Sequence, residues 1–169
     1  PSSVYVFSSD NEAQAILTMI LSSVGLASNF KLVAGDIPNA AAVILVNSKS
    51  KEQERFIIYN QTFMHNIQEK INYWASVSIL AHEIGHHLNG HSLLSGGSRP
   101  SLELEADKFS GFALASLGAT LEESQTAISY LVPEKASLTH PPRSARLAAI
   151  ANGWYENNRI NKEDKSLKK

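Results

Sequence analysis

Apolar residues occur in short runs in the first third of the chain and at helical spacing in the remainder. Short runs rich in β-branched and aromatic residues are typical of strands. Four such runs lie at residues 4–7, 30–33, 41–46 and 55–59. The run at 41–46 contains no polar residue. We therefore expect a small sheet with the 41–46 strand in its centre.

Two helices are expected beside this sheet. Ser9 is followed three residues later by Glu12, a capping-box spacing that predicts a helix beginning here and ending near Gly25. A shorter helix is expected at about 62–70, after the last strand. The first third of the chain thus predicts a small mixed α/β layer.

The rest of the chain has the spacing of helices. One apolar face, on a helix that should end near Gly90, consists of Tyr73, Val77, Leu80, Ile84 and Leu88. After a glycine-containing loop at 92–99, three more helices are expected, beginning at Pro100, at the Thr120 cap and at Pro142. We expect an α+β fold with one domain at 1–158 and a flexible, Lys-rich tail at 159–169.

Composition narrows the possible functions. The 169 residues are 43% hydrophobic, enough for the core of one domain, and a formal net charge of −1 gives no sign of a nucleic-acid partner. Without cysteine, any metal site must use nitrogen and oxygen ligands. No apolar run reaches the roughly 20 residues of a transmembrane helix, so we expect a soluble chain. Because the chain begins with Pro1 rather than Met, we also expect a processed or excised piece of a longer protein.

An HExxH motif lies within the apolar helix expected at 73–90. His82 and His86 are one helical turn apart, so both imidazoles can reach one metal ion. Glu83 lies beside them and can act on a water at that metal. This arrangement is typical of zinc-dependent peptidases.

Two histidines leave the site one ligand short, because catalytic zinc usually has three protein ligands and a position for water. The next helix offers a candidate in Glu103. Asp107 lies one turn later on the same face, where it could accept the outer ring N–H of a ligand histidine and so orient it. Glu105 faces elsewhere by the same spacing. One Zn²⁺ per chain is therefore expected.

Three ordered motifs carry a family resemblance. HExxH is followed by Glu-x-Glu-Ala-Asp at 103–107, and then by Thr-His-Pro-Pro at 139–142 with Arg146 six residues after the histidine. Together they resemble the gluzincin metallopeptidases of the HtpX and CAAX-prenyl-protease type, above all the small soluble minigluzincins and periplasmic relatives. The resemblance covers about residues 55–154, whereas residues 1–54 match only in the order of strands and helices.

The resemblance implies a zincin-like domain and a role for each motif residue. His82, His86 and Glu103 would bind zinc, Glu83 would be the general base, and Asp107 would support a ligand histidine. His140 and Arg146 would lie near the metal, where either could stabilise the oxyanion. Similarity to periplasmic members favours the bacterial cell envelope or periplasm.

The function expected is zinc-dependent endopeptidase activity on soluble peptides or proteins, because the membrane helices of the integral-membrane relatives are absent from the chain. The strand at 55–59, if it is a sheet edge, could pair with an extended substrate. One alternative is a latent or regulatory zinc domain in which His140 closes the fourth coordination position. A structural zinc site is another, although it would have no use for Glu83.

Each assigned residue also has a purely structural interpretation. HExxH could occur by chance, and Glu103 and Asp107 could be carboxylates favoured at a helix N-terminus. His140 could be a turn residue before proline, and Arg146 a partner in a surface salt bridge. His87 and His91 are expected at the surface or beside the ligands rather than as ligands.

Overall fold

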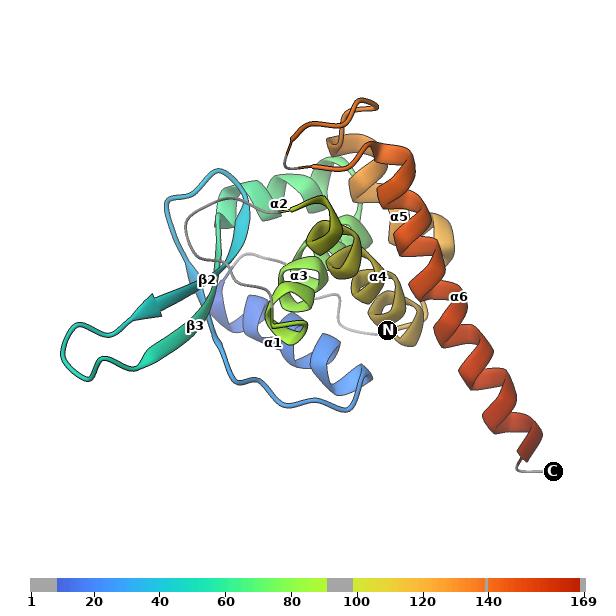
Figure 1. The fold of residues 1–169 in the computed structure, drawn as a ribbon, viewed down its shortest axis with the longest axis horizontal. Helices are drawn as coiled ribbons and strands as arrows, with labels where there is room; N and C mark the ends of the chain where they lie inside the picture. The colour runs from blue at the N-terminus through green and yellow to red at the C-terminus, as the bar shows by residue number, and fades with distance from the viewer. Residues whose placement is uncertain (1–8, 91–98, 139, 168–169) are drawn as a thin grey trace.

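The computed structural model describes residues 9–90, 99–138 and 140–167, with side chains described up to residue 163. The strand expected at 4–7, His91 and all but the last residue of the loop expected at 92–99 lie outside the described residues. Within them the fold is α+β and mostly helical, with six helices and one small sheet (Figure 1). No helix of this part of the chain is long and apolar enough to span a membrane.

The sheet consists of β1 (Lys31–Ala34), β2 (Ala40–Val46) and β3 (Gln53–Tyr59), in the order β1-β3-β2. β3 is parallel to β1 and antiparallel to β2. The prediction that the 41–46 strand is central is therefore wrong for the described strands, because β3 takes the central place and β2 lies at an edge among them.

The apolar run of β2 misled because only its first half is covered by the rest of the protein. Ala40 and Ala42 are buried, whereas Leu45 and Val46 are 50% and 58% exposed. Figure 1 shows the far end of the β2–β3 hairpin projecting from the body of the molecule. The hydrophobicity of the β2 sequence therefore did not indicate how many strands pair with β2.

The helices are α1 (Asp10–Ser23), α2 (Gln61–Lys70), α3 (Tyr73–Leu88), α4 (Pro100–Ser116), α5 (Leu121–Leu131) and α6 (Arg143–Leu167). The predicted caps are present, since Ser9 accepts a hydrogen bond from the N–H of Glu12 and Thr120 forms a complete capping box with Glu123. α6 continues through most of the segment expected to be a flexible tail and ends at Leu167.

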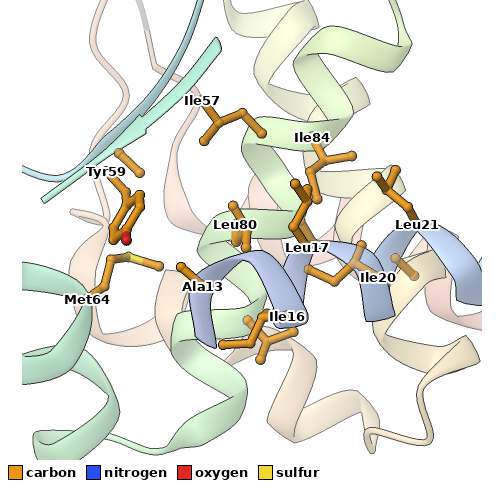
Figure 2. Packing of buried hydrophobic residues seen from close by; sticks show 14 of the residues in the cluster. Ala13, Ile16, Leu17, Ile20, Leu21, Ile57, Tyr59, Met64, Leu80 and Ile84 are labelled. Carbon is orange, nitrogen blue, oxygen red and sulfur yellow. The ribbon is translucent and has the colours of Figure 1, made fainter. Parts of the chain in front are cut away.

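The core forms around α1 and the apolar side of α3. Figure 2 shows Leu17 and Ile20 of α1 near Leu80 and Ile84 of α3, and all four side chains are fully buried. This confirms the apolar face predicted for the HExxH helix. Because that face is directed into the core, the motif's polar residues lie on the other side of α3.

Small residues allow the helices around the motif to approach closely. A Cβ added to Gly85 of α3 would lie 3.0 Å from the Cα of Ala106 on α4. A Cβ at Gly111 of α4 would collide with the Ile150 carbonyl of α6, and one at Gly153 with the Lys108 carbonyl. Side chains on the facing surfaces of α3, α4 and α6 can therefore reach one another.

Candidate metal centre

Three side chains from two helices converge at the close contact between α3 and α4. The Nε2 atoms of His82 and His86 are 3.1 Å apart. The Glu103 carboxylate from α4 reaches both rings, with Oε2 at 3.4 Å from Nε2 of His82 and Oε1 at 3.3 Å from Nε2 of His86. These three residues form a group whose possible ligand atoms all lie within 4.8 Å of one another.

The spacing of these atoms fits a tetrahedral zinc ion. Nitrogen and oxygen ligands at ~2.0–2.1 Å from zinc are separated from one another by about 3.3 Å in a tetrahedron. Two imidazoles and one carboxylate are also a ligand set found in catalytic zinc sites. The residues present therefore fit the metal that the motif predicts.

Asp107 and Arg146 lie behind His82. Asp107, which is 1% exposed, is 2.8 Å from Nδ1 of His82, as the helical spacing predicted. Arg146 donates from Nε and from an Nη atom to the two Asp107 oxygens, both at 2.7 Å. Burial would raise the pKa of Asp107, but the hydrogen bonds from Arg146 and His82 outweigh burial and lower it. Asp107 is therefore a charged acceptor for the His82 ring.

The surface salt-bridge interpretation of Arg146 is wrong, because this side chain is buried. Its Nε and one of its Nη atoms donate to Asp107, and it comes within 3.6 Å of Glu103. We propose that Arg146 positions Asp107 and Glu103 rather than acting on the substrate.

Glu83 lines the same cavity as the three residues that could hold a metal ion, which are called the metal group below. One of its carboxylate oxygens accepts a hydrogen bond of 2.8 Å from the backbone N–H of Ala42 in β2. Burial raises the pKa of Glu83, although the neighbouring His82 and His86 rings and the Ala42 N–H oppose the rise. A carboxylate whose pKa is raised is suited to take up and release a proton near neutral pH.

The metal group opens into a cavity of about 680 Å³. Ala40, Ala41 and Ala42 of β2 form one wall, and Ile128 of α5 contributes to another. His140 also lines the cavity, but its side chain is exposed and lies outside the three-residue metal group. Its backbone N–H donates to the Ser137 hydroxyl at 3.0 Å. The structure thus brings six of the seven predicted site residues together, since Arg146 contacts Asp107 and Glu103, and it places His140 on the wall of the same cavity.

His87 was not expected to be a buried anchor. It is 2% exposed, and its Nε2 lies 2.6 Å from the Phe56 carbonyl of β3. Burial lowers the pKa of His87, and this favours the neutral ring. The sequence held one signal for this contact. Glu83 and His87 are four residues apart and therefore share one face of the helix, so a sheet contact at Glu83 brings His87 near the same sheet.

Metal uptake should be coupled to proton release at His82. Burial disfavours the charged ring, but hydrogen bonds to Asp107 and Glu103 outweigh burial and raise the pKa of His82 to about 10 in the metal-free protein. Below that pH a proton occupies His82 and must leave before a metal can bind. We expect zinc binding at pH 7 to release about one proton from His82, and the affinity to fall about tenfold for each pH unit below 10.

Calorimetric titration with zinc in buffers of different ionisation enthalpy measures this proton release. Asp107→Asn is the matched variant, because it weakens the interaction that raises the His82 pKa, and it should release fewer protons. Equal proton release by both proteins would contradict the assignment of the released proton to His82.

Comparisons of the chain with protein-family models, with curated proteins and with solved structures found no match. Function therefore has to be inferred from the residues and geometry of the site.

Proposed function

We propose that this protein is a zinc-dependent endopeptidase that cleaves soluble peptides or proteins. The observation that carries the proposal is the position of Glu83, which lines the same cavity as the three residues that could hold a metal ion. A purely structural zinc site needs neither a cavity nor a carboxylate at its open side.

The bound zinc ion would supply Lewis acidity, polarising a substrate carbonyl and lowering the pKa of a coordinated water. Glu83 would accept a proton from the attacking water and return it to the leaving amine. The Ala42 N–H fixes one Glu83 oxygen, so the other is free to carry this proton. His140, on the cavity wall, is the proposed donor to the developing oxyanion.

The substrate is proposed to lie along β2. The expectation that the 55–59 strand serves as the substrate edge is wrong, because β3 has a strand on each side. β2 has β3 as its one neighbour among the described strands, and Asn39 to Ala42 border the cavity. An extended peptide could therefore pair with this edge, so that main-chain hydrogen bonds give affinity without strong sequence selectivity.

Away from the metal, the cavity wall is apolar. This part consists of side chains from α2, α3, α5 and the segment after α5: Phe63, Ile79, Ala127, Ile128, Leu131 and Val132. A charged substrate side chain would lose its hydration there without gaining a partner. We therefore propose that cleavage occurs beside a bulky apolar residue.

Digestion of an unfolded protein by the zinc-loaded enzyme, with the cut sites mapped by mass spectrometry, tests the activity and this preference together. We expect cuts flanked by Leu, Ile, Phe or Val, and loss of activity when a chelator removes the metal. Ile128→Asp should suppress cleavage beside apolar residues at least about tenfold, since it places a charge in the apolar wall. Tyr130→Asp, on the same helix but 72% exposed, should not change the preference.

Cleavage without any apolar preference would contradict the proposed substrate class but not the activity. No cleavage by zinc-loaded protein would contradict the activity itself. If His140→Ala then gained activity, the latent form would be supported. The structure gives that alternative no specific support, since His140 lies outside the metal group.

A further inference from the structure

We propose that His87 is a positioning residue that holds α3 against β3, so that Glu83 keeps a fixed relation to the edge of β2. This inference rests on the proposed function, because it concerns how the general base meets a substrate on that edge. His87 lies outside the metal group and outside the residues that line the cavity.

Three contacts join His87 to strand β3 and to Phe30, the residue immediately before β1. Its Nε2 is 2.6 Å from the Phe56 carbonyl oxygen, and its own carbonyl accepts a 2.8 Å hydrogen bond from the Arg55 guanidinium. The Phe30 ring stacks on the imidazole with 5.0 Å between ring centroids. The last turn of α3 is therefore fixed to β3 from two directions.

The hydrogen bond to Phe56 determines the form of the imidazole. A carbonyl oxygen only accepts hydrogen bonds, so Nε2 must carry the proton. The other ring nitrogen, Nδ1, is buried and has no hydrogen-bond partner among the described residues. Burying a polar atom without a partner is unfavourable, and an apolar ring would fill the same space without this cost. Packing alone therefore does not account for a histidine here.

The geometry connects this contact to the active site. Glu83 and His87 are four residues apart on α3, and each makes a polar contact with the sheet. Glu83 contacts Ala42 of β2, and His87 contacts Phe56 of β3, which pairs with Val43, the residue after Ala42. The two contacts thus set the height and rotation of α3 relative to the strand that would carry the substrate.

The metal ligands do not depend on this contact. His82 and His86 come from α3 and Glu103 from α4, and the sheet contributes no ligand. Loosening α3 from the sheet should therefore impair catalysis without weakening metal binding. A residue that only stabilised the fold would not separate these two properties.

The test compares His87→Phe with His87→Gln. Phenylalanine keeps the ring that stacks on Phe30 but has no donor for Phe56, whereas glutamine can place an N–H donor near the position of Nε2. We expect His87→Phe to lower kcat about 10- to 100-fold with little change in KM, because small misplacements of catalytic groups have effects of this size. His87→Gln should restore most of the rate, and Co²⁺ should bind all three proteins with equal affinity.

A second measurement does not depend on peptide cleavage. Hydrogen exchange of the Ala42 amide, followed by NMR in the zinc-loaded protein, reports whether Glu83 still holds β2. We expect exchange about tenfold faster in His87→Phe than in the wild type or in His87→Gln, while the amide of Leu80 in the core of α3 is unchanged.

Unchanged Ala42 exchange in His87→Phe would overturn the proposal, whether or not the wild type cleaves peptides. Equal acceleration at Leu80 would also overturn it, since that result indicates general destabilisation. If the wild type did not cleave peptides but Ala42 exchange changed as expected, the proposed function would be contradicted. The inference that His87 holds α3 against β3 would still stand.

Discussion

Glu83→Gln should abolish peptide hydrolysis while the protein still binds one zinc ion. The amide keeps the size of the side chain and can accept the Ala42 N–H through its oxygen, but it cannot take a proton from water. General acid–base catalysis contributes roughly 10²- to 10⁴-fold, and we expect a loss at the upper end of this range because the same group serves both proton transfers. The rate of cleavage of a quenched peptide and the zinc content of the purified protein measure the two effects.

Glu105→Gln is the matched control. Glu105 is an exposed carboxylate on α4, two residues from the proposed ligand Glu103, so its substitution changes charge near the site without touching the cavity. Its activity should equal that of the wild type. Full activity in Glu83→Gln would refute the role of Glu83 and with it the proposed mechanism. Loss of zinc from Glu83→Gln would show that the carboxylate helps to hold the metal.

Arg146→Met should have the largest effect on stability. It removes the paired donor of Asp107 and leaves a buried carboxylate with His82 as its remaining hydrogen-bond partner. Removing one partner of a buried ion pair typically costs about 3–5 kcal/mol, far more than a surface pair contributes. Zinc affinity should also fall, by about 10- to 100-fold, because Asp107 would no longer be held against His82. Urea denaturation and zinc titration measure the two losses.

Arg143→Met provides the comparison on the same helix. Arg143 is partly exposed and bonds to the exposed Glu134 and to the Val132 carbonyl, so its loss should cost no more than about 1 kcal/mol. Adding Asp107→Asn to Arg146→Met removes the unpaired charge and should recover part of the lost stability. If Arg146→Met and Arg143→Met were equally stable, Arg146 would not be a buried partner of Asp107.

The spacing of residues within single helices was predicted correctly because a helix fixes its own geometry. The HExxH spacing placed His82 and His86 on one side, and the four-residue interval placed Glu103 and Asp107 on one face of the next helix. The capping pairs and the apolar face of α3 were equally local, and the structure confirms them. Convergence of α3 and α4 was inferred from the need for a third ligand.

The order of the strands and the partners of buried polar groups could not be derived in this way. An apolar run shows that a strand is shielded from water, but not whether another strand or a helix shields it, and this is why β2 was placed in the centre. The pairing of Arg146 with Asp107 and the burial of His87 against Phe56 were not predicted, because both depend on residues distant in sequence.

The sequence by itself determined the local arrangement of the candidate site: two imidazoles at helical spacing on one helix, two carboxylates at helical spacing on the next, and no thiol in the chain to replace them. Tertiary structure alone decided which strand borders the candidate metal group, that Arg146 is paired with Asp107, and that His87 is buried against Phe56 of β3. The physical reason is the range of the interactions. Helical periodicity and capping act within a few residues, whereas shielding from water and pairing of buried charges depend on which distant segments pack together.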